Sequence, residues 1–267
     1  MKLPPLAWPL AALLPCTAAA QTLALGWDEA GYDAVEKTPG GFVLNRDRGT
    51  LRGPTLRAGA DAAGLRLGAE ASQWRGTPGY EGFTQIGLPL ATGTQLRWRR
   101  AALSVEPAEP WSAAGLLWRP GLALATQQIR RAILASPISS AATETLHRQS
   151  AAATLALERP LGAVTLGAGA WAAWPLRQRL DVDTFGVLDR YDLEPDGGKA
   201  GALTLSIDAR LAPGWAILVH AAREVHEFGA SAAVLVTRGG QPAAVSTYPG
   251  SVQRVTRAGV ELRLDLR

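Results

Sequence analysis

The last eight residues of the chain, from Val260, alternate strictly between aliphatic and ionised side chains. In RAGVELRLDLR, Arg257 to Arg267, a valine and three leucines take every second position, and the residues between them are glutamate, arginine and aspartate. Successive side chains of a β-strand point to opposite faces, so this stretch predicts a strand with one apolar and one charged face. The two faces of such a strand must meet different surroundings.

The same alternation recurs along the chain, in TLRAGADA from Thr55, LRLGAEAS from Leu65, ALTLSIDAR from Ala202 and, less strictly, AILVHAAREVH from Ala216. The pattern and its breaks predict twelve strands. Their expected ranges are 22–31, 55–62, 65–74, 81–91, 94–105, 113–119, 121–133, 148–159, 162–175, 200–211, 214–226 and 254–267.

The connections between these strands alternate between short and long. Short turns are expected at 62–64, 92–93, 119–121, 160–161 and 212–214, and long segments near 33–53, 75–80, 106–112, 135–147, 177–198 and 227–252. This resembles bacterial outer-membrane β-barrels, which have an even number of strands, tight periplasmic turns and long external loops. We therefore expect an all-β fold, a single up-and-down antiparallel transmembrane β-barrel of about twelve strands that forms one domain, residues 21–267.

The N-terminus has the features of an export signal. Lys2 precedes an apolar run from Leu6 to Leu14, and Ala18 and Ala20 fit the small-residue cleavage pattern, so residues 1–20 are predicted to be a signal peptide. The single cysteine, Cys16, lies within it, which leaves the expected mature chain without disulfides or thiol chemistry. The expected location is the bacterial outer membrane.

Charge and composition narrow the expected partners. The net charge of the whole chain is +4, and basic and acidic residues are interleaved without a basic stripe, so no nucleic-acid binding is expected. The three histidines are too dispersed for a zinc motif, and neither a metal nor another cofactor is expected. The expected partners are outer-membrane lipid, the barrel assembly machinery, and a polysaccharide or small solute, with the segments 177–198 and 227–252 as external binding regions.

If the aliphatic faces meet lipid, the charged faces line the lumen. The predicted lumen residues are Arg57, Asp61, Arg66, Glu70, Arg97, Arg99, Glu158, Asp208, Arg210, Glu261, Arg263, Asp265 and Arg267. Opposite charges there must pair or meet water, and the sequence leaves open whether the lumen is a narrow pore or a salt-bridged plug. The predicted function is a passive channel or a structural component of envelope or polysaccharide export.

A surface hydrolase is the alternative. His220, Glu224 and His226 share one face of a predicted strand, and Asp181 and Asp183 follow a strand expected nearby. Carboxylates beside a histidine could activate a water molecule. Together with the hairpin-like stretch GFTQIGLPLATGT, this resembles the omptin outer-membrane proteases, and the resemblance implies a rim site built from Asp181, Asp183 and His226. A lipid-modifying enzyme is a further form of this alternative.

Overall fold

Antiparallel strands make up most of the described chain, and most of them pair with the strands that precede and follow them in sequence. The computed structural model describes residues 19–38, 40–83 and 88–266. Within them, ten long antiparallel strands close a barrel. These are β1 (Ala19–Lys37), β2 (Val43–Ala62), β3 (Leu65–Gly76), β5 (Pro89–Pro107), β7 (Leu116–Ile133), β8 (Ala142–Leu161), β9 (Val164–Asp183), β11 (Ala200–Ala212), β12 (Trp215–Phe228) and β15 (Ser251–Leu266).

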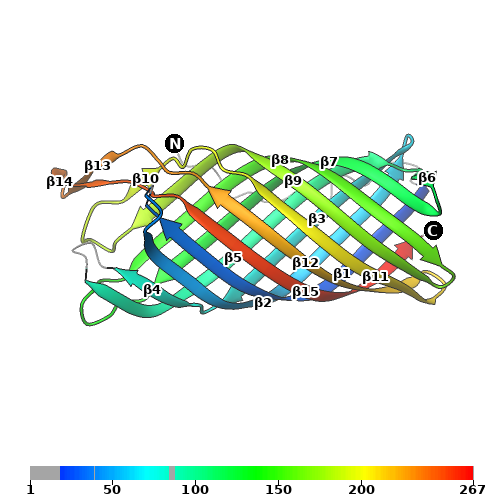
Figure 1. The fold of residues 1–267 in the computed structure, drawn as a ribbon, viewed down its shortest axis with the longest axis horizontal. Coiled ribbons are helices and arrows are strands. Elements are labelled where there is room, and N and C mark those ends of the chain that lie inside the picture. The colour runs from blue at the N-terminus through cyan, green and yellow to red at the C-terminus, as the bar shows by residue number, and fades with distance from the viewer. Residues whose placement is uncertain (1–18, 39, 84–87, 267) are drawn as a thin grey trace.

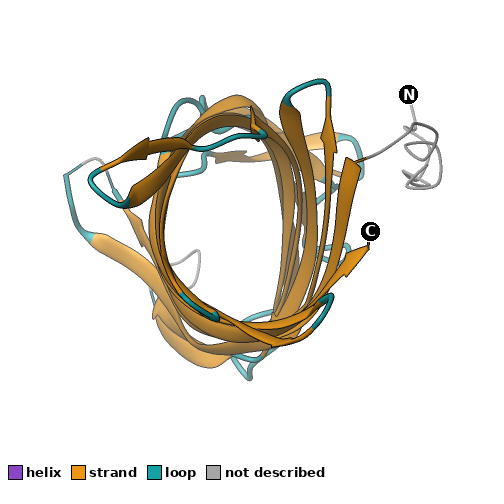
Figure 2. Cartoon of the chain, turned by 90° about the vertical axis from the view of Figure 1, so that its right-hand side faces the viewer, coloured by secondary structure: helices purple, strands orange, loops and turns teal. Residues whose placement is uncertain are grey.

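The barrel closes where the first strand meets the last. β1 pairs with β15 from Gln21 opposite Leu266 to Glu36 opposite Ser251, and its other edge pairs with β2. The remaining strands follow chain order around the ring (Figures 1 and 2). The predicted fold class, an up-and-down antiparallel barrel, is confirmed. The predicted signal peptide lies outside the described residues except for its last two, with which β1 begins.

The strand count is ten and not twelve, because two predicted turns lie inside strands. Gly93 is part of β5, and Pro120 is part of β7. Proline interrupts a sheet only where its missing N–H would be needed. Pro120 is in register with Leu155 of β8, and the ladder between β7 and β5 begins only at Leu122, so the missing donor interrupts no ladder bond to β5.

Five short strands lie at the two ends of the barrel. β4 (Gly79–Phe83) continues β3 beyond a break and pairs with β2 and β5, so the predicted strand 81–91 is in fact parts of two antiparallel strands. β6 (Trp111–Ala113) lies against the start of β7, at the end with the tight turns, which we call the turn end. β10 (Tyr191–Leu193), β13 (Val234–Arg238) and β14 (Gln241–Ser246) lie at the opposite, loop end (Figure 1).

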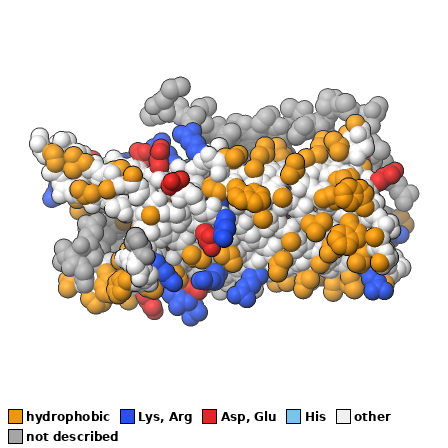
Figure 3. Space-filling view, turned by 45° about the horizontal axis from the view of Figure 1, so that its top comes forward, with side chains coloured by type: hydrophobic (Ala, Val, Ile, Leu, Met, Phe, Trp, Pro, Cys, Tyr) orange, Lys and Arg blue, Asp and Glu red, His pale blue; other side chains and the backbone are white. Residues whose placement is uncertain are grey.

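Exposed aliphatic side chains form an apolar belt around the turn half of the barrel, and Figure 3 shows one side of it. Leu25, Leu124 and Leu203 project outward with about 60 to 70% of their surface exposed. β1 has 19 residues, and a strand of that length tilted by about 40° rises roughly 45–50 Å, about twice the apolar band of an outer-membrane barrel. The belt therefore accounts for half of the barrel's height. No helix of the described residues is both long and apolar enough to cross a bilayer.

An outward row of arginines follows the belt on its loop side. Arg75 on β3 pairs in register with Arg97 on β5, which pairs with Arg130 on β7. The alternate residues Trp74 and Trp98 point inward and are fully buried. Arg97 and Arg99 were predicted to line the lumen. This is wrong, because they alternate along β5 with the inward Trp98 and therefore lie on the outer face.

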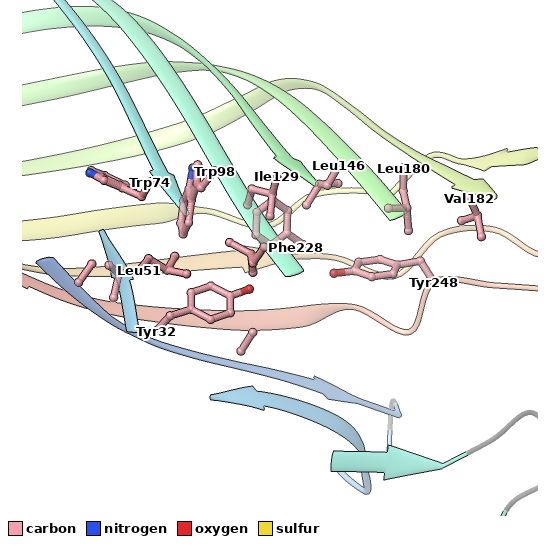
Figure 4. Packing of buried hydrophobic residues seen from close by; sticks show 14 of the residues in the cluster. Tyr32, Leu51, Trp74, Trp98, Ile129, Leu146, Leu180, Val182, Phe228 and Tyr248 are labelled. Atoms are coloured by element: carbon pink, nitrogen blue, oxygen red, sulfur yellow. The ribbon is translucent and has the colours of Figure 1, made fainter. Parts of the chain in front are cut away.

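The loop half contains a conventional hydrophobic core inside the barrel (Figure 4). Tyr32, Trp74 and Trp98 pack edge to face, with ring centroids 6.2 Å apart for Tyr32 and Trp98 and 5.8 Å for the two tryptophans. This apolar layer consists of Tyr32, Leu51, Trp74, Leu96, Trp98, Ile129, Leu146, Leu180, Val182, Leu193, Phe228, Tyr248 and Val255, with two alanines, Ala30 and Ala34. The barrel is thus apolar outside in its turn half and apolar inside in its loop half.

Candidate functional site in the barrel interior

Below the apolar layer, a cluster of ionised side chains crosses the interior. Asp28 lies at its centre without solvent exposure, and its carboxylate accepts hydrogen bonds from Thr55 (2.6 Å) and Trp74 (3.2 Å). His220 Nε2 lies 2.9 Å from Asp28 Oδ1, and Arg257 Nη1 lies 3.6 Å from Oδ2. The central carboxylate therefore has a partner for each of its oxygens.

A glycine allows the side chains of Asp28 on β1 and His220 on β12 to approach each other. Gly259 lies on β15 between them, in register with Asp28 on one side and His220 on the other. A Cβ at Gly259 would overlap Asp28 Oδ1 and meet the imidazole at 2.8 Å. A side chain at this position would thus push the carboxylate and the imidazole apart.

Further charges extend this cluster toward both sides. Glu224, also without exposure, accepts from Arg257 Nε (2.9 Å) and lies 3.1 Å from His226. Arg57 forms ion pairs with Glu261 (2.8 Å) and Glu70 (3.0 Å). Because each buried charge here has a counter-charge, the cluster avoids the full desolvation cost of isolated ions.

On the loop side of the apolar layer, one arginine gathers three carboxylates. Arg131 contacts Glu36 (2.8 Å), Asp47 (3.0 Å) and Glu144 (2.8 Å). A cavity of about 20 Å³ lies beside it, which is room for about one water molecule. The apolar layer and the side chains around Arg131 together fill the barrel interior in the loop half.

The turn half is hollow. A cavity of about 540 Å³ runs below the apolar layer, walled mainly by alanine, glycine, serine and threonine. A second cavity of about 720 Å³ adjoins it through shared lining residues and reaches the turn residues Gly162 and Gly214. The lumen is therefore a chamber that opens at the turn end and is closed toward the loop end.

Ten of the other predicted lumen residues lie along this interior, mostly as ion pairs, and Arg267 lies outside the described residues. Glu158 pairs with Arg119 at 3.0 Å. Asp61 pairs with Arg66 at 2.8 Å, near the turn end. Arg263 contacts both Asp208 and Asp265. Arg210 lines the wider cavity beside them, and Arg57, Glu70 and Glu261 belong to the central cluster described above.

The structure does not bring together Asp181, Asp183 and His226. Asp181 points outward from β9, where it accepts from Arg179 (2.7 Å). Asp183 also points outward and contacts Arg190. His226 is buried inside the barrel beneath Trp98, with ring centroids 5.1 Å apart. The acidic pair and the histidine lie on opposite faces of the barrel wall, so no water could contact all three.

At the loop end, a single carboxylate joins the two long segments. Asp189 accepts from Thr237 Oγ1 (2.6 Å) and from the backbone N–H groups of Gly239 (3.0 Å) and Gly240 (2.9 Å). These donors stabilise the carboxylate and hold the pKa of Asp189 below its ordinary value. The β13–β14 hairpin is thereby fixed to the segment that follows β9.

Several interior residues have no signal in the sequence, among them Asp28, Arg100, Arg131 and Arg148. Each lies in a stretch without clear alternation, such as QQIRRAIL around Arg131. Their partners lie on distant strands, so a local pattern could not have identified them. Among the described residues, no group of three or more His, Cys, Asp and Glu side chains is arranged to hold a metal ion.

No family model matches the sequence, and no curated protein matches it. Among solved structures, the outer membrane protease OmpT from Escherichia coli is similar with a TM-score of 0.68 and 9% identity, over 94% of this chain and 97% of OmpT. The chain has the fold of an outer-membrane β-barrel.

Two further structures are similar at a lower level. The toluene transporter TodX from Pseudomonas putida has a TM-score of 0.35 and 12% identity, over 93% of this chain and 90% of its own. The translocator domain of the autotransporter NalP from Neisseria meningitidis has a TM-score of 0.39 and 9% identity, over 90% and 88%. At such scores neither carries an argument, and the identity to OmpT shows the shared fold alone.

Proposed function

We propose that this protein is a non-conducting outer-membrane barrel, a structural component of the cell envelope whose chamber opens toward the periplasm. The apolar layer carries this proposal. Tyr32, Trp74 and Trp98 are each at most 2% exposed and fill the lumen above the chamber. A passive channel would need a continuous water-filled path, which this layer interrupts.

The orientation follows from the two ends of the barrel. Barrels of this class have their tight turns in the periplasm and their loops outside, so the chamber faces the periplasm. The outward arginines Arg75, Arg97 and Arg130 then lie at the level of the external lipid headgroups, where guanidinium groups can contact phosphate. Export by the signal peptide and insertion by the barrel assembly machinery belong to the same proposal.

A polysaccharide is the proposed external partner. The β13–β14 hairpin and the segment that follows β9 form one extension at the loop end, joined through Asp189. Deletion of residues 234–246 should abolish glycan binding to whole cells while leaving the barrel folded. Glycan binding that survives this deletion would place the partner elsewhere.

Planar-bilayer recording tests the central proposal. The refolded protein should insert without conductance steps, and vesicles that contain it should not admit small sugars. An open porin reconstituted in parallel controls for the assay, and vesicle flotation controls for insertion. Regular conductance steps from the inserted wild-type protein would overturn the proposal.

The hydrolase alternative has no support from the site geometry. It required Asp181, Asp183 and His226 around one water molecule, and the barrel wall separates them. The similarity to OmpT adds no argument for proteolysis, because at 9% identity it concerns the fold.

A further inference from the structure

One buried arginine at the closed end of the chamber has no carboxylate partner. Of the three arginines that are buried among the described residues, Arg131 and Arg257 contact acidic side chains, and Arg148 does not. Arg148 is 2% exposed, and one of its nitrogens donates to the backbone oxygen of Glu227 (3.3 Å). Its Nε and Nη2 have no partner.

An unpaired guanidinium in this position is unfavourable. Removing a charge from water costs several kcal/mol even after relaxation, and a counter-charge is the usual compensation. The other buried charged side chains among the described residues, such as Asp28, Glu224 and Arg257, each have an oppositely charged partner. Arg148 lines the chamber, but its unpartnered Nε and Nη2 are covered in this conformation, so a ligand would reach them once the guanidinium turns toward the cavity.

Neighbouring strands add further donors at the same place. Arg148 on β8 is in register with Gln127 on β7, which is in register with Arg100 on β5. All three side chains line the 540 Å³ cavity. Gln127 is buried, and its Nε2 donor is also without a partner. Arg100 reaches Glu224 only at 3.5 Å.

Aromatic rings hold this row in place. The guanidinium of Arg148 lies 4.9 Å from the ring centroid of Phe228, and that of Arg100 lies 5.1 Å from Trp171. Stacking on one face leaves the edge of a guanidinium free to donate. Trp171 also lines the cavity and offers an apolar surface next to the donors.

We infer that the closed end of the chamber is a binding site for a small organic monocarboxylate. Its carboxylate would accept from the Nε and Nη2 edge of Arg148 in the paired geometry that guanidinium groups favour, and from Gln127 Nε2. One uncompensated charge matches a monoanion, and the cavity volume lies in the usual range for small-molecule sites. The solute enters from the turn end and places its apolar part against Trp171.

Calorimetric titration of the detergent-folded protein tests this inference, with benzoate as the probe. Benzoate should bind, while the uncharged benzamide and inorganic phosphate should bind at least about tenfold more weakly, since a hydrogen bond to a charged group contributes about that factor. Benzamide or phosphate binding as tightly as benzoate would overturn the assignment, and so would the absence of binding by benzoate.

Variants locate the site. Arg148→Gln should weaken benzoate binding about tenfold or more, and Arg148→Lys, which keeps the charge but lacks the paired donors, should weaken it less. Arg177→Gln removes the same charge from the exposed outer face of β9 and should leave binding unchanged. If Arg148→Gln does not fold, Gln127→Leu serves instead, with an expected loss of about threefold. Unchanged binding in the folded variant places the ligand elsewhere and refutes the site.

A stability measurement separates a ligand-binding arginine from a structural one. In the absence of ligand, Arg148→Gln should not lower the temperature at which the barrel loses its compact gel migration, because the substitution removes an uncompensated charge. A clear decrease would assign Arg148 a structural role and overturn the inference. The site rests on the proposed function, since the chamber ends here only while the apolar layer closes the lumen. If benzoate does not bind and the protein does not conduct, the site is refuted but the closed barrel is not. Conductance by the protein would refute the closed barrel.

Discussion

Replacing Asp28 with asparagine should destabilise the barrel more than any exposed charge substitution. The carboxylate contacts Thr55 (2.6 Å), Trp74 (3.2 Å), His220 (2.9 Å) and Arg257 (3.6 Å) without solvent exposure. Asparagine keeps one acceptor for the hydroxyl and the indole, but it turns an amide toward His220 and removes the negative charge beside Arg257. Removing one partner of a buried ion pair costs about 3–5 kcal/mol, and we expect about 3 kcal/mol because part of the hydrogen bonding survives.

The same substitution on the outer face of β1 is the matched control. Asp33 accepts from Arg46 at 2.7 Å, but both side chains are partly exposed. Such pairs contribute about 0–1 kcal/mol, so Asp33→Asn should have little effect. The assay is guanidinium unfolding of vesicle-inserted protein, followed by tryptophan fluorescence. Equal free energies of unfolding for the two variants would refute the reasoning that the central cluster depends on a buried counter-charge.

Three further outcomes can be measured on the same preparation. Gly259→Ala should cost about 1–3 kcal/mol through overpacking against Asp28, whereas Gly31→Ala, whose Cβ meets its nearest neighbour at 3.7 Å, should cost little. Asp189→Asn should speed hydrogen exchange at the Gly240 amide. In the wild type the protection factor of this amide, its exchange rate corrected for the intrinsic pH dependence, should fall as the pH falls below about 4, because a carboxylate with a lowered pKa stabilises the folded loop above its unfolded pKa and loses that effect as it protonates. Unboiled protein should migrate faster than boiled protein in a denaturing gel, and identical migration would contradict a closed barrel.

The sequence predicts the turn half of the barrel because lipid imposes a simple rule there. Every outward residue of a spanning strand must be apolar, so Leu203, Leu205 and Ile207 alternate visibly with polar residues. Turn signals inside strands mislead the count. Pro120 followed by glycine has the composition of a turn, and it is the ladder of β7 with β8 that keeps it in a strand.

Local sequence patterns could not predict the loop half of the barrel or the central cluster. Residues 33–53 were expected to form a long loop, but most of them extend β1 and β2 beyond the lipid, where water on the outside no longer requires apolar residues. Asp28 and His220 lie 192 positions apart in sequence. Their contact depends on which strand closes the barrel and in what register, and neither is encoded within one strand.

The outward arginine row beyond the belt fixes the immersion depth of the molecule. Arg75, Arg97 and Arg130 lie side by side on three neighbouring strands, and each would cost about 2–4 kcal/mol at the middle of a bilayer. Sliding inward would submerge the three together, and sliding outward would expose the leucines of the belt to water. A barrel that cannot shift vertically holds the mouth of its chamber at a constant height relative to the membrane surface.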